Sequence, residues 1–438
     1  NPVGNLFRNK DNEDKTLRVF GNIFAEVDLL KGLKFKTNFG LTMSNFSSTN
    51  FNPTYVEPNV QRELANLTKV EQNLMEWAFT NTLNYTTTIK DKHTVNFLVG
   101  AESIESELET LSAFRQGFPG NDLNFQILAA GDAGTQQNNN GKIESSLVSY
   151  FGKANYSFDD RYLASYTIRR DGTSKLANNK WGTFSAASFG WKISNEEFFT
   201  SDIISMMKLR LGWGQNGNQD IPPYVTSSGF LSDPFNSNYA IDGGQNVVFN
   251  GYILSRNSNS DLKWETTEQF NIGLDLGLIS NRLNFTLDYF NKETNDLLLE
   301  RNLAPISGGT NSAVWDNVGT MKNHGLEFGA DYRNDANKEF QISANLNVSV
   351  IRNELTSLNE GIDFVGIDAS SLRNNNFDQE VSRTAVGQPI ASFYGWVADG
   401  IFQNQSEIDA HATQSTGTSP GDIRFKDINN DRIFKIVF

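Results

Sequence analysis

Strict alternation of apolar and polar residues is the feature that most restricts the fold of this chain. Apolar residues occupy the even positions of 270–278, and mostly polar or small residues lie between them. After Ser280-Asn281 the apolar residues move to the odd positions of 283–289. Because successive side chains of a strand point to opposite faces, this pattern predicts two strands joined by a tight turn.

The same pattern recurs along the chain and predicts about a dozen strands before residue 353. Segments near 392–404 and 421–426 are candidates for further strands, and Asn195 to Phe199 is a candidate for one helical turn. Short turns are predicted near 29–32, 90–92, 159–161, 279–282 and 334–338. Long polar loops are predicted near 46–73, 109–142, 214–262, 299–321 and 353–391.

Composition excludes several classes of protein. The 438 residues carry a formal net charge of −14, which argues against a nucleic-acid-binding protein. No Cys is present, so disulfide frameworks, thiolate catalysis and zinc–thiolate sites are excluded. The sequence shows neither an apolar run long enough for a membrane-spanning helix nor an N-terminal targeting signal. The absence of a signal suggests that a leader has been removed or that the chain begins within a longer protein.

Strand length and the alternation of short and long connections favour a membrane barrel. The predicted strands often reach a dozen residues, whereas a tilted strand needs roughly 9–11 residues to cross the hydrocarbon layer. Transmembrane barrels have short turns at one rim and long loops at the other. A soluble β-sandwich, which also alternates apolar and polar residues, is the alternative. We therefore predict an all-β fold, an antiparallel transmembrane β-barrel segment of about 12–14 strands.

The barrel hypothesis assigns a face to each residue of these strands. The residues expected to face lipid are Phe270, Ile272, Leu274, Phe285, Leu287, Phe340, Ile342, Leu346 and Val348. The residues expected to face the lumen are Gln341, Ser343, Asn345 and Asn347. Aromatic residues near strand ends, where an interfacial girdle is expected, are Tyr162, Trp181, Trp213, Trp264 and Tyr289.

Motifs for catalysis are weak throughout the sequence. Gly212 to Gly217 spells the dinucleotide-binding fingerprint, but the prolines at 222 and 223 forbid the helix that the fingerprint requires. A strand that ends in a loop is the preferred interpretation. His93, His324 and His411 are isolated from one another, and no nucleophile motif is present. We therefore predict that the protein is not an enzyme and has no organic cofactor.

One short motif carries oxygen ligands at alternate positions, as the first half of a calcium loop does. The candidate metal-binding residues are Asp427, Asn429 and Asp431. Arg432 stands where such a loop requires glycine, and Phe438 stands where it requires glutamate. A polar turn is the preferred interpretation, and a bound calcium ion is the alternative.

A series of short motifs then identifies a family. They are Arg161 to Ser174, Trp181 to Ser194, Leu209 to Gln219, Leu262 to Thr267, Asn281 to Lys292, Asn323 to Glu327, Phe393 to Phe402 and Gly421 to Ile423. In order and spacing the chain resembles the barrel portion of SusC/RagA-type TonB-dependent outer-membrane transporters over nearly its whole length.

This resemblance implies a large barrel with an N-terminal plug that imports oligosaccharides or peptides. It implies energy from the TonB complex, which acts on the plug, and capture of substrate by a SusD-like surface lipoprotein. No plug is recognisable in this sequence, and about a dozen strands cannot close a barrel of the size, about 22 strands, known for such transporters. Residues 1–438 are therefore expected to be the middle portion of a longer barrel.

The predicted function is TonB-dependent uptake of oligosaccharides or peptides in the outer membrane of a Gram-negative bacterium. The predicted partners are membrane lipid, the lipoprotein, the TonB complex and the substrate, with no nucleic acid. Candidate substrate contacts are the loop aromatics Tyr239, Trp315 and Trp396, for which loop packing is the alternative. The competing hypotheses are a self-contained outer-membrane channel and a soluble β-rich binding protein or adhesin.

Overall fold

A computed structural model describes residues 2–57, 60–232, 237–239, 249–303, 313–334, 339–359, 364–366, 382–414 and 417–427. Within these residues the chain is built almost entirely from strands. The first twelve strands are β1 (Glu13–Leu30), β2 (Leu33–Asn52), β3 (Tyr55–Glu57), β4 (Val60–Arg62), β5 (Asn66–Ile89), β6 (His93–Gln116), β7 (Gln137–Phe158), β8 (Tyr162–Thr173), β9 (Trp181–Lys192), β10 (Ile204–Asn218), β11 (Gly229–Leu231) and β12 (Ile253–Arg256).

The second half of the chain adds eleven shorter or similar strands. They are β13 (Glu265–Leu278), β14 (Leu283–Asn295), β15 (Leu298–Asn302), β16 (Ala313–Asn317), β17 (Gly319–Arg333), β18 (Ser343–Leu358), β19 (Phe364–Gly366), β20 (Ser382–Ala385), β21 (Ser392–Phe393), β22 (Ala398–Ile401) and β23 (Ile423–Phe425). The α-helices are α1 (Pro2–Arg8) and α2 (Gln405–Ala410), and four 3-10 turns are η1 (Leu123–Phe125), η2 (Leu128–Ala130), η3 (Ala133–Thr135) and η4 (Ile193–Asn195). Among the described residues no helix has the length and apolar character needed to cross a membrane.

Backbone hydrogen bonds connect twelve strands in the order β1-β2-β5-β6-β7-β8-β9-β10-β13-β14-β17-β18. Each long strand therefore pairs with the next long strand of the chain, as expected when antiparallel strands follow one another. The all-β antiparallel class and the number of about a dozen strands are confirmed. Within the part of the chain that the structure describes, β1 and β18 stand at the two ends of this order.

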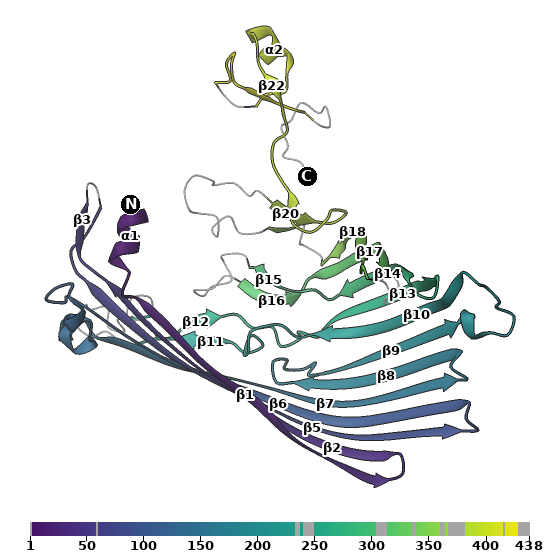
Figure 1. Cartoon of the computed structure of the whole chain (residues 1–438). Helices are drawn as coiled ribbons and strands as arrows, with labels where there is room; N and C mark the ends of the chain where they lie inside the picture. The colour runs from purple at the N-terminus through teal and green to yellow at the C-terminus, as the bar shows by residue number, and fades with distance from the viewer. Residues whose placement is uncertain are drawn as a thin grey trace. The chain divides into compact units, whose positions relative to one another are not determined.

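The chain divides into two compact units, which are described separately. The first unit comprises residues Asn1–Ala187 and Gln219–Lys263, and the second comprises Ser188–Asn218 and Trp264–Phe438. In the first unit β1, β2, β5, β6 and β7 run side by side (Figure 1). Strands β5 and β6 have 24 residues each. Such a strand is roughly 80 Å long, far more than the hydrocarbon layer requires.

The short turns of each unit adjoin one another. In the first unit the Thr86 amide donates to the Gly32 carbonyl at 2.8 Å, and the Asp159 amide donates to the Lys92 carbonyl at 2.7 Å. The turns after β1, β5 and β7 therefore share one end of the sheet. In the second unit the Arg333 amide donates to the Arg282 carbonyl at 2.8 Å, so the turns near 279–282 and 334 are neighbours. The prediction of a common rim is confirmed within each unit, and residues 335–338 lie outside the described part.

The predicted loops are too long because strands continue past the region of alternation. Residues 46–52 belong to β2 and 66–73 to β5, so the loop predicted at 46–73 is wrong at both ends. The loops predicted at 109–142 and 299–321 likewise overlap strands at both ends, β6 and β7 for the first and β15 and β17 for the second. The loops predicted at 214–262 and 353–391 overlap a long strand only at their first end, β10 and β18, and contain the short strands β11, β12, β19 and β20. Backbone pairing needs no apolar side chains, so it extends where the hydrophobic signal has ended. The strand predicted to begin at Phe340 begins at Ser343, and the helical turn predicted at 195–199 lies at 193–195.

A small apolar core lies where β2, β5 and β6 end away from the short turns. Phe51, Leu67 and Phe118 are each at most 8% exposed, and the rings of Phe51 and Phe118 meet edge to face at 5.4 Å. Leu128 and Ala130 of the loop between β6 and β7 pack against this cluster. Because the loop buries its own apolar residues, it forms a packed cap at this end of the first unit.

Helix α1 is held against the β3–β4 hairpin by one arginine. The Arg8 guanidinium donates to the Glu57 carboxylate at 2.6 Å and lies 4.1 Å from the centre of the Tyr55 ring. The hydrogen bond from Arg8 lowers the pKa of the Glu57 carboxyl. Both groups lie beyond the long strands.

We expect Gly100→Ala to destabilise the first unit by about 1–2 kcal/mol, because overpacking a sheet displaces its neighbours. A Cβ at Gly100 would overlap the ring of Phe151 on β7 and would lie 3.0 Å from the Asn81 carbonyl oxygen. Gly21→Ala on β1 is the matched control, since its Cβ would meet nothing within 4 Å. Reversible unfolding in lipid should separate the two variants, and equal stabilities would contradict this packing.

Candidate functional site

The strands of the second unit have one apolar face that runs across five strands. Leu274 of β13 lies opposite Leu209 of β10 and Leu287 of β14, and Leu287 lies opposite Phe328 of β17. Phe328 in turn lies opposite Val348 of β18. Residues on this face include Met207, Leu209, Leu211, Phe270, Ile272, Leu274, Leu276, Phe285, Leu287, Leu326, Phe328, Leu346, Val348 and Val350. The predicted common face of 270–287 and 346–348 is confirmed, whereas Phe340 and Ile342 precede β18.

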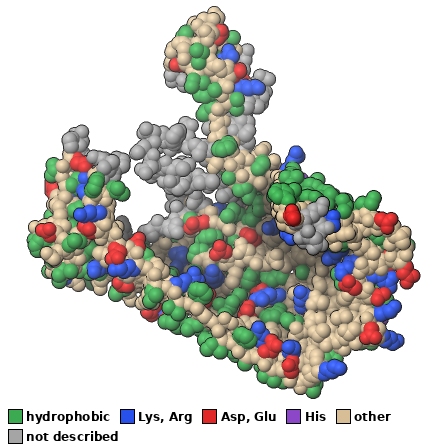
Figure 2. Space-filling view, viewed as in Figure 1, with side chains coloured by type: hydrophobic (Ala, Val, Ile, Leu, Met, Phe, Trp, Pro, Cys, Tyr) green, Lys and Arg blue, Asp and Glu red, His purple; other side chains and the backbone are tan. Residues whose placement is uncertain are grey.

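Many of these apolar side chains are exposed, among them Phe270, Ile272, Leu287, Leu346 and Val348 at 41–55%. An exposed apolar face of this extent marks contact with another apolar phase. The opposite face of the same strands carries Arg210, Asp275, Asp288 and Glu327, together with Asn345 and Asn347. Acidic and basic side chains lie close together at several places on the side turned to the viewer in Figure 2.

The first unit has the same two faces, but its apolar band covers only part of the strands. Near the turns, the strand register pairs Val27 of β1 with Phe35 of β2, Phe35 with Leu83 of β5, and Leu83 with Val99 of β6. These four residues therefore lie on one face. Beyond Trp77 and Met75 the same face becomes polar. The residues there are Asn73, Glu105, Glu107, Glu109, Lys142 and Glu144. The strands therefore continue past the apolar band at the end away from the short turns.

Aromatic residues mark both ends of the apolar band of the first unit. Near the turns the His93 ring lies 4.9 Å from Phe158, which lies 6.2 Å from Tyr162. At the other end the Trp181 ring lies 6.3 Å from Tyr150, with the Arg170 guanidinium 5.2 Å from Trp181. These positions of Tyr162 and Trp181 fit an interfacial girdle.

Two of the other predicted girdle residues are placed differently. Trp264 is 8% exposed, so its assignment to the membrane interface is wrong, because a buried ring cannot contact lipid head groups. Tyr289 lies in the middle of β14, opposite Leu326, rather than at a strand end. Trp213 lies near the end of β10, and its indole nitrogen donates to the Glu268 carboxylate at 2.6 Å.

The polar face of the first unit carries a network centred on Arg169. Its guanidinium donates to the carboxylates of Asp171 at 2.7 Å and Glu102 at 2.9 Å, and to the Ser149 hydroxyl at 2.7 Å. Thr80 donates to the second oxygen of Glu102 at 3.1 Å. Ser149 and Asp171 are buried. One cation thus links four strands, β5 to β8.

The polar face of the second unit carries a similar network centred on Arg210. Its guanidinium binds both oxygens of Asp275, at 2.9 and 2.8 Å, and donates to Asp288 at 2.9 Å. This fork geometry is the strong form of a charge-assisted hydrogen bond. Each network places two carboxylates on one guanidinium, so each polar face keeps a net negative charge at that point.

An amide ladder continues the polar face of the first unit toward the turns. The Asn96 side chain donates to Asn84 and to Thr86, and the Asn155 side chain donates to Asn96 at 3.0 Å. These groups form a water-compatible wall of donors and acceptors. Within the described residues no three His, Cys, Asp or Glu side chains are grouped to hold a metal ion.

The charge networks were missed by the sequence analysis. Arg210 is 65 residues from Asp275 and 78 from Asp288, and Glu102 is 67 from Arg169. Only the strand register brings them together. A charged residue with apolar neighbours in a predicted strand, such as Arg210 between Leu209 and Leu211, is the one sequence signal that could have indicated a distant charged partner.

The predicted substrate-contact residues lie on short hairpins and bridges. Tyr239, 53% exposed, forms an isolated bridge with Phe249, and the two rings are 6.4 Å apart. Trp315 lies on β16 opposite Glu300. The Trp396 ring lies 5.4 Å from Phe425. Their contact with substrate stays a prediction.

The structure locates the glycine motif at residues 212–217 and one residue of the candidate calcium motif. Residues 212–217 lie wholly within β10, so the dinucleotide interpretation fails, and the strand continues through the glycines rather than ending there. Of the calcium candidates, Asp427 is described, whereas Asn429 and Asp431 lie outside the described residues. The calcium hypothesis therefore stays untested.

Comparison with known proteins gives consistent results. Residues 2–421 match the family model "TonB dependent receptor-like, beta-barrel". The chain is similar to TonB-dependent receptor P3 of Formosa agariphila, at 33% identity over 94% of this chain and 40% of that protein. It is also similar to TonB-dependent receptor SusC of Bacteroides thetaiotaomicron, at 35% identity over 57% of this chain and 25% of that protein.

Solved structures agree with these relatives. The RagAB peptide transporter superposes with a TM-score of 0.78 and 26% identity, covering 90% of this chain and 41% of the matched chain. The present chain therefore spans about 40% of the length of the TonB-dependent receptor P3.

Proposed function

Because this chain belongs to the TonB-dependent receptor-like β-barrel family, we propose that it forms part of the barrel of a nutrient importer. Family members are outer-membrane β-barrels of Gram-negative bacteria and are not enzymes. The resemblance to SusC/RagA-type transporters and the predicted lack of an enzymatic step are thereby confirmed. For this chain we propose TonB-dependent uptake of oligosaccharides or peptides.

The observation that carries the proposal is the pair of opposite faces. One face offers exposed apolar residues to lipid, and the other offers the Arg169 and Arg210 networks and the amide ladder to a wet interior. A sheet that crosses a membrane must satisfy its backbone groups within the sheet and present apolar side chains to lipid. The long strands between β1 and β18 have hydrogen-bonded neighbours on both sides, and within the apolar band one face of each strand presents apolar side chains.

The proposed partners follow from the relatives. SusC and the RagAB transporter favour pairing of this chain with a SusD-like surface lipoprotein, and the family favours energy input from the TonB complex through a plug domain. The RagAB structure is of a peptide transporter, so peptides stand beside oligosaccharides as the proposed substrate class. The aromatics Tyr239, Trp315 and Trp396 stay candidates for contact with either substrate.

Uptake by whole cells tests this function. Cells that carry or lack the gene for the complete transporter are given labelled oligosaccharides and labelled peptides too large for porins. We expect uptake of one class to disappear with the gene and also to stop when a protonophore collapses the proton-motive force. Uptake that needs the gene but persists with the protonophore would favour the self-contained channel, and no loss of uptake in the deletion strain would refute import.

A further inference from the structure

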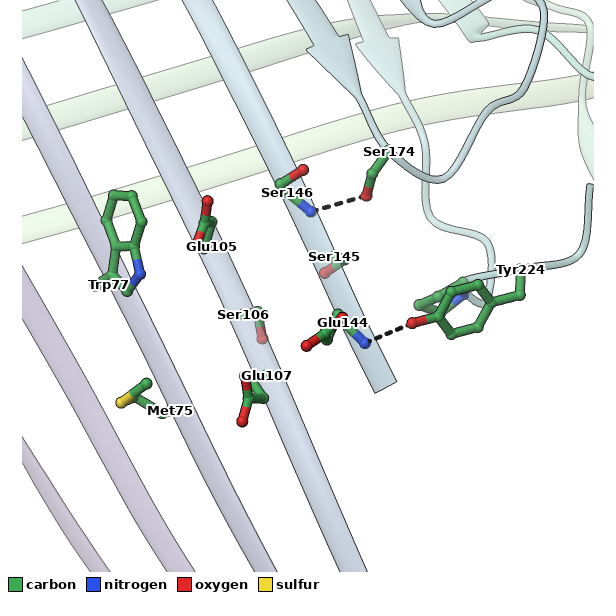
Figure 3. A pocket seen from close by; sticks show the side chains of 11 residues that line it. Met75, Trp77, Glu105, Ser106, Glu107, Glu144, Ser145, Ser146, Ser174 and Tyr224 are labelled. Atoms are coloured by element: carbon green, nitrogen blue, oxygen red, sulfur yellow. Dashed lines mark hydrogen bonds between the residues drawn. The ribbon is translucent and has the colours of Figure 1, made fainter. Parts of the chain in front are cut away.

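A pocket of about 410 Å³ lies in the first unit, where β5, β6 and β7 extend past the apolar band. Met75 and Trp77 of β5 form one side, and Tyr224 forms the other (Figure 3). The carboxylates of Glu105, Glu107 and Glu144 lie between them (Figure 3). The sequence pattern alone predicts no functional role for any of these residues.

The pocket opens on the apolar side of the sheet rather than on the side of the Arg169 network. Trp77 lies in register with Leu41 of β2 and with Glu105 of β6. Directly paired residues of antiparallel strands share one face. A ligand in this pocket is therefore on the opposite face from the polar wall proposed to line the import path, just beyond the apolar band.

Loop residues hold the far wall of the pocket in place. Strand β8 ends at Thr173, opposite Leu147, so β7 residues before Leu147 have no β8 partner on that side. The Ser146 amide donates to the Ser174 hydroxyl at 2.8 Å, and the Glu144 amide donates to the Tyr224 hydroxyl at 3.0 Å (Figure 3). Tyr224 has φ +67°, a left-handed conformation that a non-glycine residue seldom adopts. The hydrogen bond from the Glu144 amide holds the tyrosine hydroxyl beside β7.

The pocket carries uncompensated negative charge. Lys142 forms ion pairs with Glu107 at 3.1 Å and with Glu144 at 2.9 Å. Glu105 is exposed and has no side-chain partner among the described residues. Three carboxylates thus face one ammonium group, which leaves two negative charges beside the Trp77 and Tyr224 rings.

We propose that this pocket binds a lysine or arginine side chain of a partner polypeptide at the membrane surface. The carboxylates form charge-assisted hydrogen bonds with an ammonium or guanidinium group, and the aromatic rings attract a cation over their faces. Met75 and Trp77 cover the aliphatic stem of such a side chain. A neutral saccharide would leave the two negative charges uncompensated, and anionic lipid head groups would be repelled.

The test uses the complete transporter in lipid nanodiscs and end-blocked Gly-Arg-Gly as the probe, with Gly-Gln-Gly as the neutral peptide. Binding is followed by saturation-transfer NMR. We expect Gly-Arg-Gly to bind and Gly-Gln-Gly not to bind. Glu105→Gln should weaken binding about three- to tenfold, the loss of one charge-assisted contact. Glu109→Gln is the matched control, because Glu109 lies on the same strand and face outside the pocket lining.

A second variant keeps the proposal testable if the first lowers expression. Trp77→Leu retains all three carboxylates and should weaken Gly-Arg-Gly binding about threefold through loss of the aromatic face. Equal binding by the Glu105→Gln and Glu109→Gln proteins would overturn the proposal, as would equal binding of Gly-Gln-Gly or of a neutral trisaccharide. Uptake and pocket binding are separate measurements, so loss of one does not imply failure of the other.

Discussion

Arginine at position 287 is expected to destabilise the barrel by about 2–4 kcal/mol, whereas arginine at position 286 should cost less than about 1 kcal/mol. The two residues are neighbours on β14, at the same depth and on opposite faces. Leu287, 48% exposed, lies between Leu274 and Phe328 on the apolar face. Thr286 lies between Asp275 and Gly329 on the polar face, where a cation gains a carboxylate neighbour.

Leu287→Arg and Thr286→Arg therefore form a matched pair that differs only in the face. Reversible unfolding of the complete transporter barrel in lipid bilayers gives both free energies. Leu287→Ala controls for the loss of the side chain itself and should cost less than Leu287→Arg. Equal costs for the two arginine variants would contradict the assignment of this face to lipid.

Alternation identified the strands because a lipid-facing strand must repeat with period two. Residues 270–289 show this clearly, and the turn at Ser280-Asn281 was correctly placed between β13 and β14. The same argument explains why strand ends were missed. Residues 66–73 and 105–116 carry too few regularly alternating apolar residues to indicate a strand, since they lie beyond the apolar band, and backbone hydrogen bonds define them as strands.

The polar side of the sheet was less predictable than the apolar side. Its side chains obey no periodic rule beyond polarity, so Glu102 gave no sign that it would meet Arg169 across β7. The pocket at Trp77 was hidden for a related reason. Its far wall comes from Tyr224, whose contact with Glu144 joins residues 80 positions apart.

Replacing Arg210 by methionine is expected to cost about 2–3 kcal/mol. Removal of one partner from a buried ion pair costs about 3–5 kcal/mol, because the remaining charges stay desolvated and uncompensated. The Arg210 side chain is 34% exposed, and its partners Asp275 and Asp288 are 18% and 21% exposed, so solvent screening reduces this figure. Methionine retains most of the aliphatic volume, which limits the contribution of lost packing.

Lys208→Met is the matched control for Arg210→Met. Lys208 lies two residues away on the same face of β10, opposite Asp275, and the structure shows no ion pair for it among the described residues. Its loss should cost less than about 0.5 kcal/mol, as for most surface substitutions. If the two variants lowered the free energy of unfolding in bilayers equally, the hydrogen bonds of Arg210 to Asp275 and Asp288 would add nothing beyond the effect of removing one positive charge from this face.

A protein that lacks both carboxylates of this network separates the repulsion between Asp275 and Asp288 from the loss of the hydrogen bonds made by Arg210. In protein that carries Asp275→Asn and Asp288→Asn, the further change Arg210→Met removes no charge pair and leaves no carboxylates facing each other. In that protein Arg210 is a partly buried cation with neither Asp275 nor Asp288 as a carboxylate partner, so its desolvation offsets part of what its hydrogen bonds contribute. The added cost of Arg210→Met should therefore fall to below about 1.5 kcal/mol. An undiminished cost in this background would mean that the guanidinium acts through packing on the sheet rather than by holding the two carboxylates of β13 and β14 together.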